Sequence, residues 1–387
     1  MESLPPNPMR AKVDQPQPRP ILPPELIAEI FTWLPVDSLL RFRCVCKSFK
    51  TLISSTDFVK SHMRSRKALS NTRPNRAERL FRRSMSFFMR RERDIDCRVR
   101  SCSLYAVYNN PQIDLPELGS LLDQDYDFHD RIIGSCDGLL CSVIYPDHDV
   151  VVWNPSTRVS RSLPNYEPGF DHWRSSCYTV FGFGYDFQLD DYKVVAVLAY
   201  RDDKQGNDIE YQTSVYVFSL RTRAWRKMGG FHYGVPLMGD AKFAAGSLYY
   251  KMSMSPFGAL VSLDLATETY DKVVLPDLGK DTTHWELETL IDRLSVSCFN
   301  NDGFCTVWVM KELGWTKLFR VGGFRGEFCY PLYISDIGEV LWETYGSLII
   351  YNYKDKSCRL LTSEVLKNQD RDTTVYMETL VSPMMMN

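Results

Sequence analysis

Five stretches of the chain repeat one pattern, and their spacing constrains the fold more than any other feature. Each has a short apolar strand, a polar turn and the start of a second strand. They read VVVWNPSTRVSRSLP (150–164), VYVFSLRTRAWRKMG (215–229), LVSLDLATETYDKVVLP (260–276), TVWVMKELGWTKLFRV (306–321) and LIIYNYKDKSCRLL (348–361). Aligned on Asn154, Ser219, Asp264, Val309 and Asn352, they lie 65, 45, 45 and 43 residues apart. Similarity at a nearly fixed period is typical of repeat architectures.

A second element recurs upstream of four of these repeats. It is a turn followed by an apolar strand, and it starts 14–18 residues before the aligned position. The copies are Asp137-Gly138-Leu139-Leu140, Gly246-Ser247-Leu248-Tyr249, Asp292-Arg293-Leu294-Ser295 and Gly338-Glu339-Val340-Leu341. Because Gly and Asp accept the positive φ that hairpin turns need, each unit is predicted to contain two hairpins, which make one four-stranded sheet.

The repeat predicts a mainly β fold in which such sheets surround an axis. Kelch-type repeats of β-propellers run to about 50 residues, and the roughly 300 residues after position 85 hold about six such units. Residues 85–387 are therefore predicted to form a kelch-like propeller of about six blades. A pair of packed β-sheets is the rival, which the period disfavours. Thr374–Val381 is predicted to close the ring beside an early strand, with Ser86–Met89 and Val99–Val107 as the first strands.

The N-terminal part of the chain has a helical period instead. Pro23 and Pro24 suit a first helical turn, and Pro35 ends the segment that they begin. Apolar residues predict three short helices, with Ile27, Ile30, Phe31 and Leu34 in the first, Leu39, Leu40, Phe42 and Val45 in the second, and Val45, Phe49, Leu52 and Ile53 in the third. So small a unit has little core of its own, so we expect some of these side chains to contact a partner.

Charge is distributed unevenly along the chain. Residues 1–20 contain six prolines and few apolar residues, which predicts a disordered tail. Residues 1–100 hold 21 Lys and Arg against 10 Asp and Glu, whereas the remainder holds 25 against 38. Residues 61–84 are predicted to be a solvated basic linker. A nucleic-acid patch is the alternative, but few aromatic residues accompany the basic ones.

Several classes of function find no support in the sequence. The eleven cysteines follow no even framework and no apolar leader is visible, which indicates reduced thiols in the cytoplasm or nucleus, or both. No run approaches the ~18 apolar residues of a membrane span. Cysteines and histidines lack the spacing of zinc ligands, and no catalytic signature occurs. We expect no catalytic residue, no metal, no cofactor, and no membrane or nucleic-acid partner.

Residues 21–60 resemble an F-box. The matching segments are Leu22-Pro23, Glu25, Ile30, Leu34-Pro35-Val36, Leu39-Leu40-Arg41-Phe42 and Arg43-Cys44-Val45-Cys46-Lys47. Phe49 stands where the family usually has Trp, which keeps an aromatic ring but loses its N–H.

The remainder resembles the F-box-associated domain of plant F-box proteins. The matching segments are Ser135-Cys136-Asp137-Gly138-Leu139-Leu140-Cys141, Val152-Trp153-Asn154-Pro155-Ser156-Thr157, Phe181-Gly182-Phe183-Gly184-Tyr185-Asp186 and Asp191-Tyr192-Lys193-Val194-Val195. These signatures cover about residues 130–230, and beyond them the likeness is the repeat pattern alone.

The resemblance implies a subunit of an SCF-type (Skp–cullin–F-box) ubiquitin ligase with no catalysis of its own. The F-box would bind a Skp-family adaptor and, through it, the cullin and RING subunits. The propeller would hold an unidentified protein client for ubiquitination and proteasomal degradation. The implied adaptor contacts are Leu22, Pro23, Ile30, Leu34, Pro35, Leu39, Leu40, Val45 and Cys46.

The client-binding residues are unknown from the sequence. Because loops carry binding functions, the candidates are Asn165–Ser175, Arg201–Tyr211 and Asp277–Trp285. Two alternatives stay open: an F-box scaffold or binding module with no role in ubiquitination, and a kelch-like protein that binds a small ligand at its rim.

Overall fold

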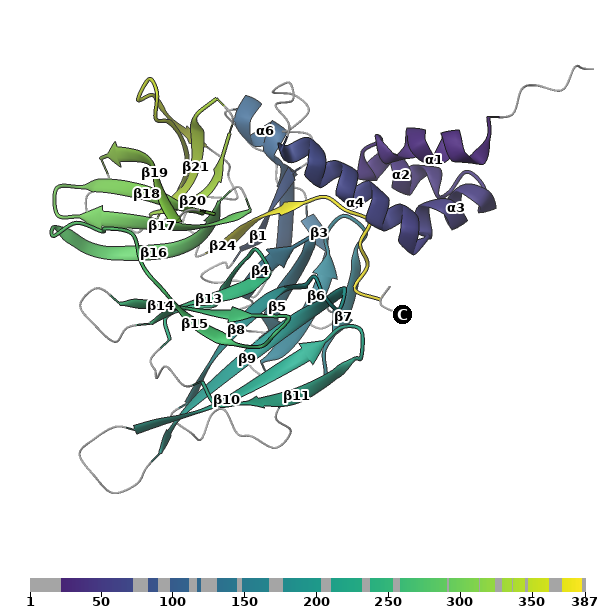
Figure 1. Ribbon diagram of the computed structural model, residues 1–387. Helices are drawn as coiled ribbons and strands as arrows, with labels where there is room; N and C mark the ends of the chain where they lie inside the picture. Colours follow the sequence, from purple (N-terminus) through teal and green to yellow (C-terminus); the bar gives the residue numbers. More distant parts are fainter. Residues whose placement is uncertain are drawn as a thin grey trace, which may run out of the picture.

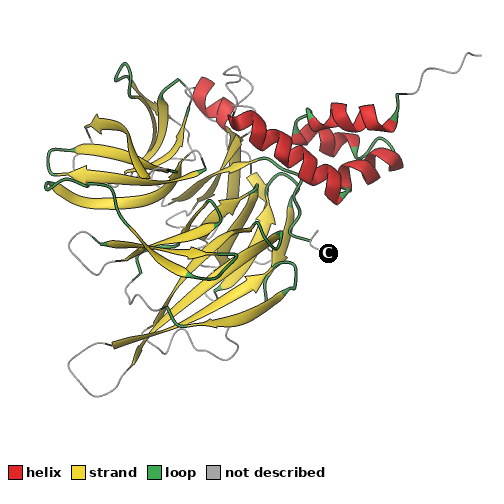
Figure 2. Cartoon of the chain, in the orientation of Figure 1, coloured by secondary structure: helices red, strands yellow, loops and turns green. Residues whose placement is uncertain are grey.

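In the computed structural model, helices form the N-terminal part of the chain and strands make up most of the remainder (Figure 1; Figure 2). The structure describes residues 22–71, 83–89, 98–110, 117–119, 131–144, 148–166, 177–202, 210–231, 237–252, 258–290, 292–312, 314–323, 329–335, 337–344, 347–361 and 371–384. The predicted disordered tail, residues 1–20, lies outside these residues, as does the later part of the predicted basic linker.

Four helices form the helical domain. They are α1 (Pro24–Thr32), α2 (Val36–Phe42), α3 (Lys47–Ser54) and α4 (Thr56–Asn71). Pro24 occupies the first turn of α1, and Cys46 caps α3 by accepting a hydrogen bond from Phe49 N through its sulfur. The three predicted short helices are therefore present. The first part of the predicted basic linker is helical, because α4 continues to Asn71.

The strands are short and follow one another in hairpins. They are β1 (Arg83–Met89), β2 (Arg98–Ser103), β3 (Glu117–Gly119), β4 (Arg131–Cys136), β5 (Leu139–Ile144), β6 (Asp149–Asn154), β7 (Val159–Ser162), β8 (Cys177–Asp186), β9 (Asp191–Asp202), β10 (Glu210–Ser219), β11 (Ala224–Gly229), β12 (Lys242–Ala244), β13 (Ser247–Met252), β14 (Ala259–Asp264), β15 (Tyr270–Val273), β16 (Thr282–Leu290), β17 (Arg293–Asn300), β18 (Phe304–Lys311), β19 (Gly314–Gly322), β20 (Cys329–Ile334), β21 (Glu339–Thr344), β22 (Ser347–Asn352), β23 (Cys358–Leu361) and β24 (Arg371–Met377).

Within the described residues these strands form six four-stranded sheets. Five sheets use consecutive strands, from β4–β7 to β20–β23, and we number them blades 1 to 5. In the sixth sheet, the C-terminal strand β24 pairs with β1, beside β2 and β3. The first strands of neighbouring blades contact one another in a closed ring, β24–β4–β8–β12–β16–β20. The predicted fold class, a helical N-terminal unit followed by a β-propeller, is confirmed, and so is closure by the C-terminal strand.

The positions on which the repeats align cap the same turn in four blades. The side chains of Asn154, Asp264 and Asn352 accept backbone N–H groups two residues further on, at 2.8, 2.9 and 3.0 Å, and Ser219 Oγ accepts Thr222 N at 3.0 Å. The residue four positions after each cap has a left-handed backbone conformation, with φ between 57° and 63° at Arg158, Arg223, Glu268 and Lys356. This local turn chemistry produces the repeat that is visible in the sequence.

Alternating strand directions give blades 1 to 5 two different faces. The turns after the first and third strands of each blade contain two to five residues and lie on one face, which we call the tight-turn face. The second and fourth strands end on the opposite face, and as many as fourteen residues, between β7 and β8, separate such a strand from the next one. We call this the long-loop face. The helical domain packs on the tight-turn face (Figure 1).

The C-terminal segment that comes after β24, residues 378–384, is held on the tight-turn face. Asn154 Nδ2 donates to the carbonyl oxygens of Thr379 (3.0 Å) and Val381 (2.6 Å). Thr379 Oγ1 donates to Asp137 O at 2.8 Å. Leu380 and Val381 join a hydrophobic cluster that contains Phe58 and Val59 of α4 together with residues of blades 1 and 2. The helical domain and the propeller thus share one core.

Two predicted strands have different limits in the structure. The predicted strand Val99–Val107 ends at Ser103, and the helix α6 (Leu104–Asn109) replaces its second half. Ser103 Oγ accepts Ala106 N at 3.2 Å, a helix cap, and Leu104, Val107 and Tyr108 are buried on one helical face. Similarly, β24 covers Arg371–Met377, so the last four residues of the predicted strand Thr374–Val381 belong to the C-terminal segment instead.

Candidate functional site

Helix α1 carries two apolar stripes that face in different directions. Ile27, Phe31 and Leu34 pack into the core of the helical domain. Leu26, Ile30 and Trp33 point away from it, and Trp33 is 61% exposed. The exposed side chains lie four and three residues apart, which places them on one side of the helix. We call Leu26, Ile30 and Trp33, with the exposed Leu22 and Val45 of the same domain, the outer stripe; all five are exposed.

The nine predicted adaptor contacts occupy three environments. Leu22, Pro23, Ile30, Pro35, Val45 and Cys46 are exposed, Leu34 and Leu40 are partly buried, and Leu39 is fully buried. Leu39 therefore packs the helical domain internally in the described structure. The exposed six keep their side chains available to a partner.

Leu26 and Trp33 are absent from the contacts predicted from the sequence, although they are exposed beside Ile30. Their signal was the spacing of Leu26, Ile30 and Trp33 along the helix. From the sequence, Ile30 was instead grouped with Ile27, Phe31 and Leu34. When a short helix has apolar residues on two sides, its sequence does not show which side is buried.

Phe49, the departure from the usual motif, belongs to an aromatic cluster inside the helical domain. Its ring lies 4.9 Å from that of Phe31 in an edge-on contact and 6.5 Å from that of Phe42. The Phe31 and Phe42 rings are 5.4 Å apart. Edge-on and tilted contacts at these distances stabilise a core beyond the area they bury. The phenyl ring thus connects all three short helices.

Helix α4 fixes the helical domain on the propeller through ion pairs. Lys67 Nζ lies 2.5 Å from Asp137 Oδ1, and Tyr192 donates to the other carboxylate oxygen of Asp137 at 3.0 Å. Lys60 pairs with Asp190, which also accepts the Tyr185 hydroxyl. We call these contacts the α4 joint. Its acidic partners lie in the turns between the first and second strands of blades 1 and 2.

Polar groups of α4 also satisfy the end of the first helical segment. His62 Nε2 hydrogen-bonds to the carbonyl oxygen of Leu34 at 3.0 Å, and Arg66 Nη2 donates to the same oxygen at 3.2 Å. Carbonyl groups at the end of a helix lack hydrogen-bond donors within that helix, so side chains of α4 supply the donors. The orientation of α1 is thereby tied to α4 and, through the α4 joint, to the propeller.

The strands that lead into the three loops proposed for the client, β7, β9 and β15, end on the long-loop face, opposite the helical domain. Residues 167–175 of the first and 203–209 of the second lie outside the described residues. The third, Asp277–Trp285, begins with a turn in which Asp277 Oδ1 accepts Gly279 N at 3.1 Å, and it continues into β16. Val274, just before it, is 84% exposed. Nothing in the described contacts identifies a client.

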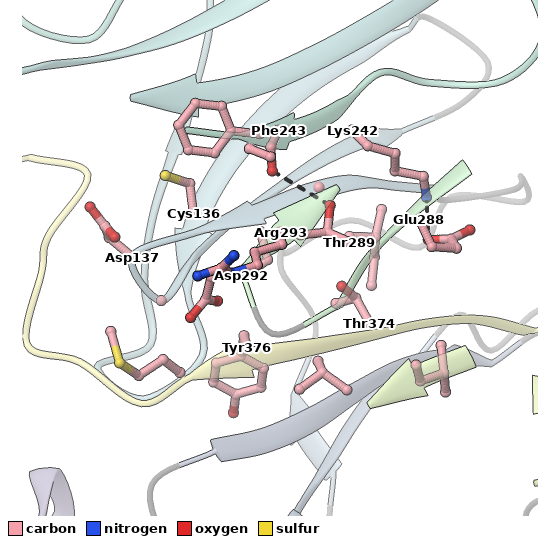
Figure 3. Close-up of a pocket in the computed structure, with 18 of the residues that line it drawn as sticks. Cys136, Asp137, Lys242, Phe243, Glu288, Thr289, Asp292, Arg293, Thr374 and Tyr376 are labelled. Carbon is pink, nitrogen blue, oxygen red and sulfur yellow. Dashed lines mark hydrogen bonds and ion pairs between the residues drawn. The ribbon is translucent and has the colours of Figure 1, made fainter. Parts of the chain in front are cut away.

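A cavity of about 490 Å³ lies among the first strands of the blades (Figure 3). Its wall includes residues of β4, β12, β16, β20 and β24, and Lys67 of α4 lies at its edge. Lys242 of blade 3 pairs with Glu288 of blade 4 at 2.8 Å, and Thr289 Oγ1 donates to Phe243 O at 3.5 Å. These bonds join neighbouring blades, so the polar wall contributes to ring closure.

The described residues show no arrangement for metal binding, since no group of three or more His, Cys, Asp or Glu side chains converges there. The nine described cysteines are all free thiols. Burial raises the pKa of the Cys136, Cys141, Cys298 and Cys305 thiols, which disfavours the reactive thiolate. No described helix is long and apolar enough to span a membrane.

Comparisons with known proteins identify both parts of the chain. Residues 20–61 match the F-box domain, and residues 91–371 match the F-box associated beta propeller domain. The F-box/kelch-repeat protein At3g23880 of Arabidopsis thaliana is 31% identical over 94% of this chain and 96% of its own length. The Arabidopsis F-box protein CPR1 is 26% identical over 85% of this chain and 81% of its own length.

F-box domains in general bind Skp-family adaptors, and F-box proteins are generally non-catalytic adaptor subunits of SCF complexes. The match to the propeller domain covers more than half of the chain. The chain therefore belongs to the family of F-box proteins with an F-box associated beta propeller domain.

Proposed function

We propose that this chain is the substrate receptor of an SCF-type ubiquitin ligase. The helical domain binds a Skp-family adaptor and, through it, the cullin and RING subunits. The propeller holds a protein client, which the catalytic subunits of the ligase ubiquitinate for proteasomal degradation. We place this activity in the cytoplasm, the nucleus, or both.

The observation that carries the proposal is the outer stripe. Leu26 and Ile30 of the nine-residue helix α1, and Trp33 directly after it, expose 46, 48 and 61% of their surface. Burying a large apolar side chain contributes about 1.5–3 kcal/mol, so the stripe offers several kcal/mol to a partner with a matching groove. Docking an apolar helical face into a groove is a common recognition mode.

The α4 joint supports a receptor role because it fixes the distance between adaptor and client. The helical domain and blades 1 and 2 share one hydrophobic cluster, and two ion pairs lock α4 onto the turns at Asp137 and Asp190. A client on the propeller is therefore held at a set position relative to the ligase. Such positioning raises the effective concentration of the reacting groups.

The test is co-purification of the full chain with a Skp-family adaptor. The double variant Ile30→Asp/Trp33→Asp places two carboxylates in the proposed contact, where desolvating them costs several kcal/mol. We expect it to lose roughly a hundredfold or more in affinity for the adaptor, measured by calorimetry.

The control is Ser61→Asp, which adds a carboxylate at an exposed polar position of α4. It should bind the adaptor as the unaltered chain does. Both Ile30 and Trp33 are exposed in the free chain, so their variants are expected to keep its melting temperature. Undiminished adaptor binding by the folded double variant would refute the outer stripe as the contact.

A further inference from the structure

Four arginines lie in or beside the turns that follow the third strands of blades 1 and 2, on the tight-turn face. Arg158 and Arg223 occupy the same left-handed position in the third turns of these two blades. Arg161 lies on β7, and Arg221 precedes Arg223 in the turn between β10 and β11. Arg158, Arg221 and Arg223 are exposed and Arg161 is partly exposed. We call the four residues the arginine patch.

Side-chain contacts bring three of these arginines around one turn. Arg161 Nη1 donates to the carbonyl oxygen of Leu220 at 3.3 Å, directly before Arg221 in the chain. Arg221 Nη1 donates to Leu189 O at 2.8 Å. Partial burial and the positive charge of Arg223 lower the pKa of Arg161. Arg161 and Arg223 are therefore close enough to repel each other, and an anion between them would relieve that repulsion.

The nearby carboxylates form hydrogen bonds or ion pairs with other groups. Asp191 accepts Ser219 Oγ and the backbone N–H of Arg221, and Asp190 pairs with Lys60. Glu268 pairs with Lys193 and Arg226. Among the described residues, no carboxylate lies within ion-pair distance of an arginine of the patch. The Asp191 carboxylate interacts electrostatically with Arg221, but within the described residues the arginines of the patch have no ion pair of their own.

The Nε and Nη2 edge of the Arg161 guanidinium group, which suits an anion best, faces a weak hydrogen-bond acceptor. Its Nε and Nη2 lie 3.3 and 3.2 Å from the thioether sulfur of Met384, an exposed residue of the C-terminal segment. This pair of N–H groups is the fork that clamps carboxylate and phosphate oxygens in a bidentate manner. A thioether accepts hydrogen bonds only weakly, so an oxyanion would replace it favourably.

We propose that the arginine patch docks a phosphorylated segment of a protein partner, with Arg161 and Arg223 gripping the phosphate and Arg158 and Arg221 at its rim. Clusters of arginine are a recurring solution for reading phosphorylated motifs. A single phosphate suits the small size of the patch. A long nucleic acid would also meet the rest of the chain, where residues 101–387 hold 25 basic against 38 acidic residues.

The proposal rests on the proposed function for the identity of the partner, a client of the ligase, but its test measures phosphate recognition directly. The full chain is applied to degenerate peptides that carry one central phosphoserine or phosphothreonine, each beside its unphosphorylated twin. We expect a subset to bind only when phosphorylated. Arg161→Gln/Arg223→Gln should weaken those peptides about tenfold or more, since each removed charged hydrogen bond contributes about 1.5–3 kcal/mol.

Two further variants distinguish bidentate recognition by the guanidinium groups from a general effect of positive charge. Arg161→Lys/Arg223→Lys keeps the charge but loses the bidentate geometry, so it should bind between the wild type and the glutamine variant. Lys272→Gln/Lys317→Gln removes two charges at exposed positions of β15 and β19 and should change nothing. Thermal melting shows whether each variant is folded.

Phosphate-independent binding, or full binding by the folded glutamine variant, would overturn the proposal. So would tighter binding of a single-stranded oligonucleotide than of any phosphopeptide, because that result assigns the patch to nucleic acid. The glutamine variant should still bind the Skp-family adaptor normally. Loss of phosphopeptides with normal adaptor binding therefore leaves the proposed function standing, whereas the outer-stripe variant tests that function separately.

Discussion

The two faces of the propeller differ in the contacts that their residues make. On the tight-turn face, Asp137, Asn154 and Asp190 each contact a segment outside their own blade, either α4 or the C-terminal segment. On the long-loop face, the described turn at Asp277 is satisfied within its own loop. Two of these residues, Asp137 and Asn154, belong to segments that carry the family resemblance, at residues 135–141 and 152–157.

The difference indicates a division of labour within one ring. Side chains of the tight-turn face join the F-box to the propeller and close the ring at the C-terminus. On the long-loop side the described contacts join blades to one another: Lys251 of blade 3 pairs with Glu286 of blade 4 at 3.3 Å, and Thr373 of β24 donates to Glu343 of blade 5 at 2.6 Å. The matched propeller domain, residues 91–371, extends over both faces, so the faces differ in their contacts and not in the extent of the family resemblance.

The largest expected effect comes from two glycines with the same backbone angle on opposite faces. Gly138 and Gly279 both have φ of 81°. A Cβ at Gly138 would lie 2.4 Å from Met377 O and from Thr379 Oγ1, whereas one at Gly279 would meet nothing within 4 Å. Gly138→Ala should therefore cost about 3 kcal/mol or more of unfolding free energy, measured by urea denaturation, because the C-terminal segment must move.

Gly279→Ala is the matched control. It carries only the backbone strain of a left-handed alanine, about 1–2 kcal/mol. Equal losses in the two variants would show that the C-terminal segment is not packed as described, and the contrast between the faces would disappear.

A smaller effect is expected at equivalent caps in blades 1 and 5. Asn154 is fully buried and donates to Thr379 O and Val381 O while its Oδ1 accepts Ser156 N. Asn154→Ala leaves two backbone carbonyls without that donor, so we expect a loss of about 2–3 kcal/mol.

Asn352 holds the same position in blade 5, but the side-chain bond described there is local, from Lys354 N to its Oδ1. Asn352→Ala should cost about 1 kcal/mol or less, again measured by urea denaturation. If both substitutions cost the same, Asn154 acts only as a turn cap, and the C-terminal segment is anchored elsewhere.

Local patterns were sufficient to predict the repeated part of the fold. The aligned positions Asn154, Asp264 and Asn352 cap their turns through bonds to residues two positions away, so sequence spacing records them directly. The three short helices and the closing strand came from equally local signals. The segment at Val99–Val107 was predicted wrongly beyond Ser103, because an apolar run that short fits a strand or a helix.

The candidate sites depend on contacts between distant residues and could not be predicted in this way. Lys60 of α4 pairs with Asp190, which lies 130 residues further along the chain. Arg161 reaches the carbonyl oxygen of Leu220 only because blades 1 and 2 are neighbours. Similarly, the burial of Leu39 and the exposure of Trp33 depend on how α1 to α3 pack together, which their separate periods do not determine.

The smallest expected effect concerns the pH range in which the α4 joint holds. Burial raises the pKa of Asp190, but hydrogen bonds from Lys60 and Tyr185 outweigh it and hold that pKa below the ordinary value of 3.8. Burial lowers the pKa of Lys67, yet the Asp137 carboxylate outweighs it and raises that pKa above the ordinary 10.5. The stabilisation that the two ion pairs contribute is therefore complete between pH 3.8 and pH 10.5. It is lost as the pH falls below 3.8 or rises above 10.5.

The measurement compares urea unfolding of the wild type with that of Lys60→Met at several pH values. Both partners are substantially exposed, with side-chain exposures of 38 and 51%, so we expect a difference below about 1 kcal/mol. The difference should be constant across neutral pH and shrink as Asp190 is protonated in acid. A change between about pH 6 and 7 would instead implicate a histidine and would contradict Asp190 as the group that sets the acid limit of the joint.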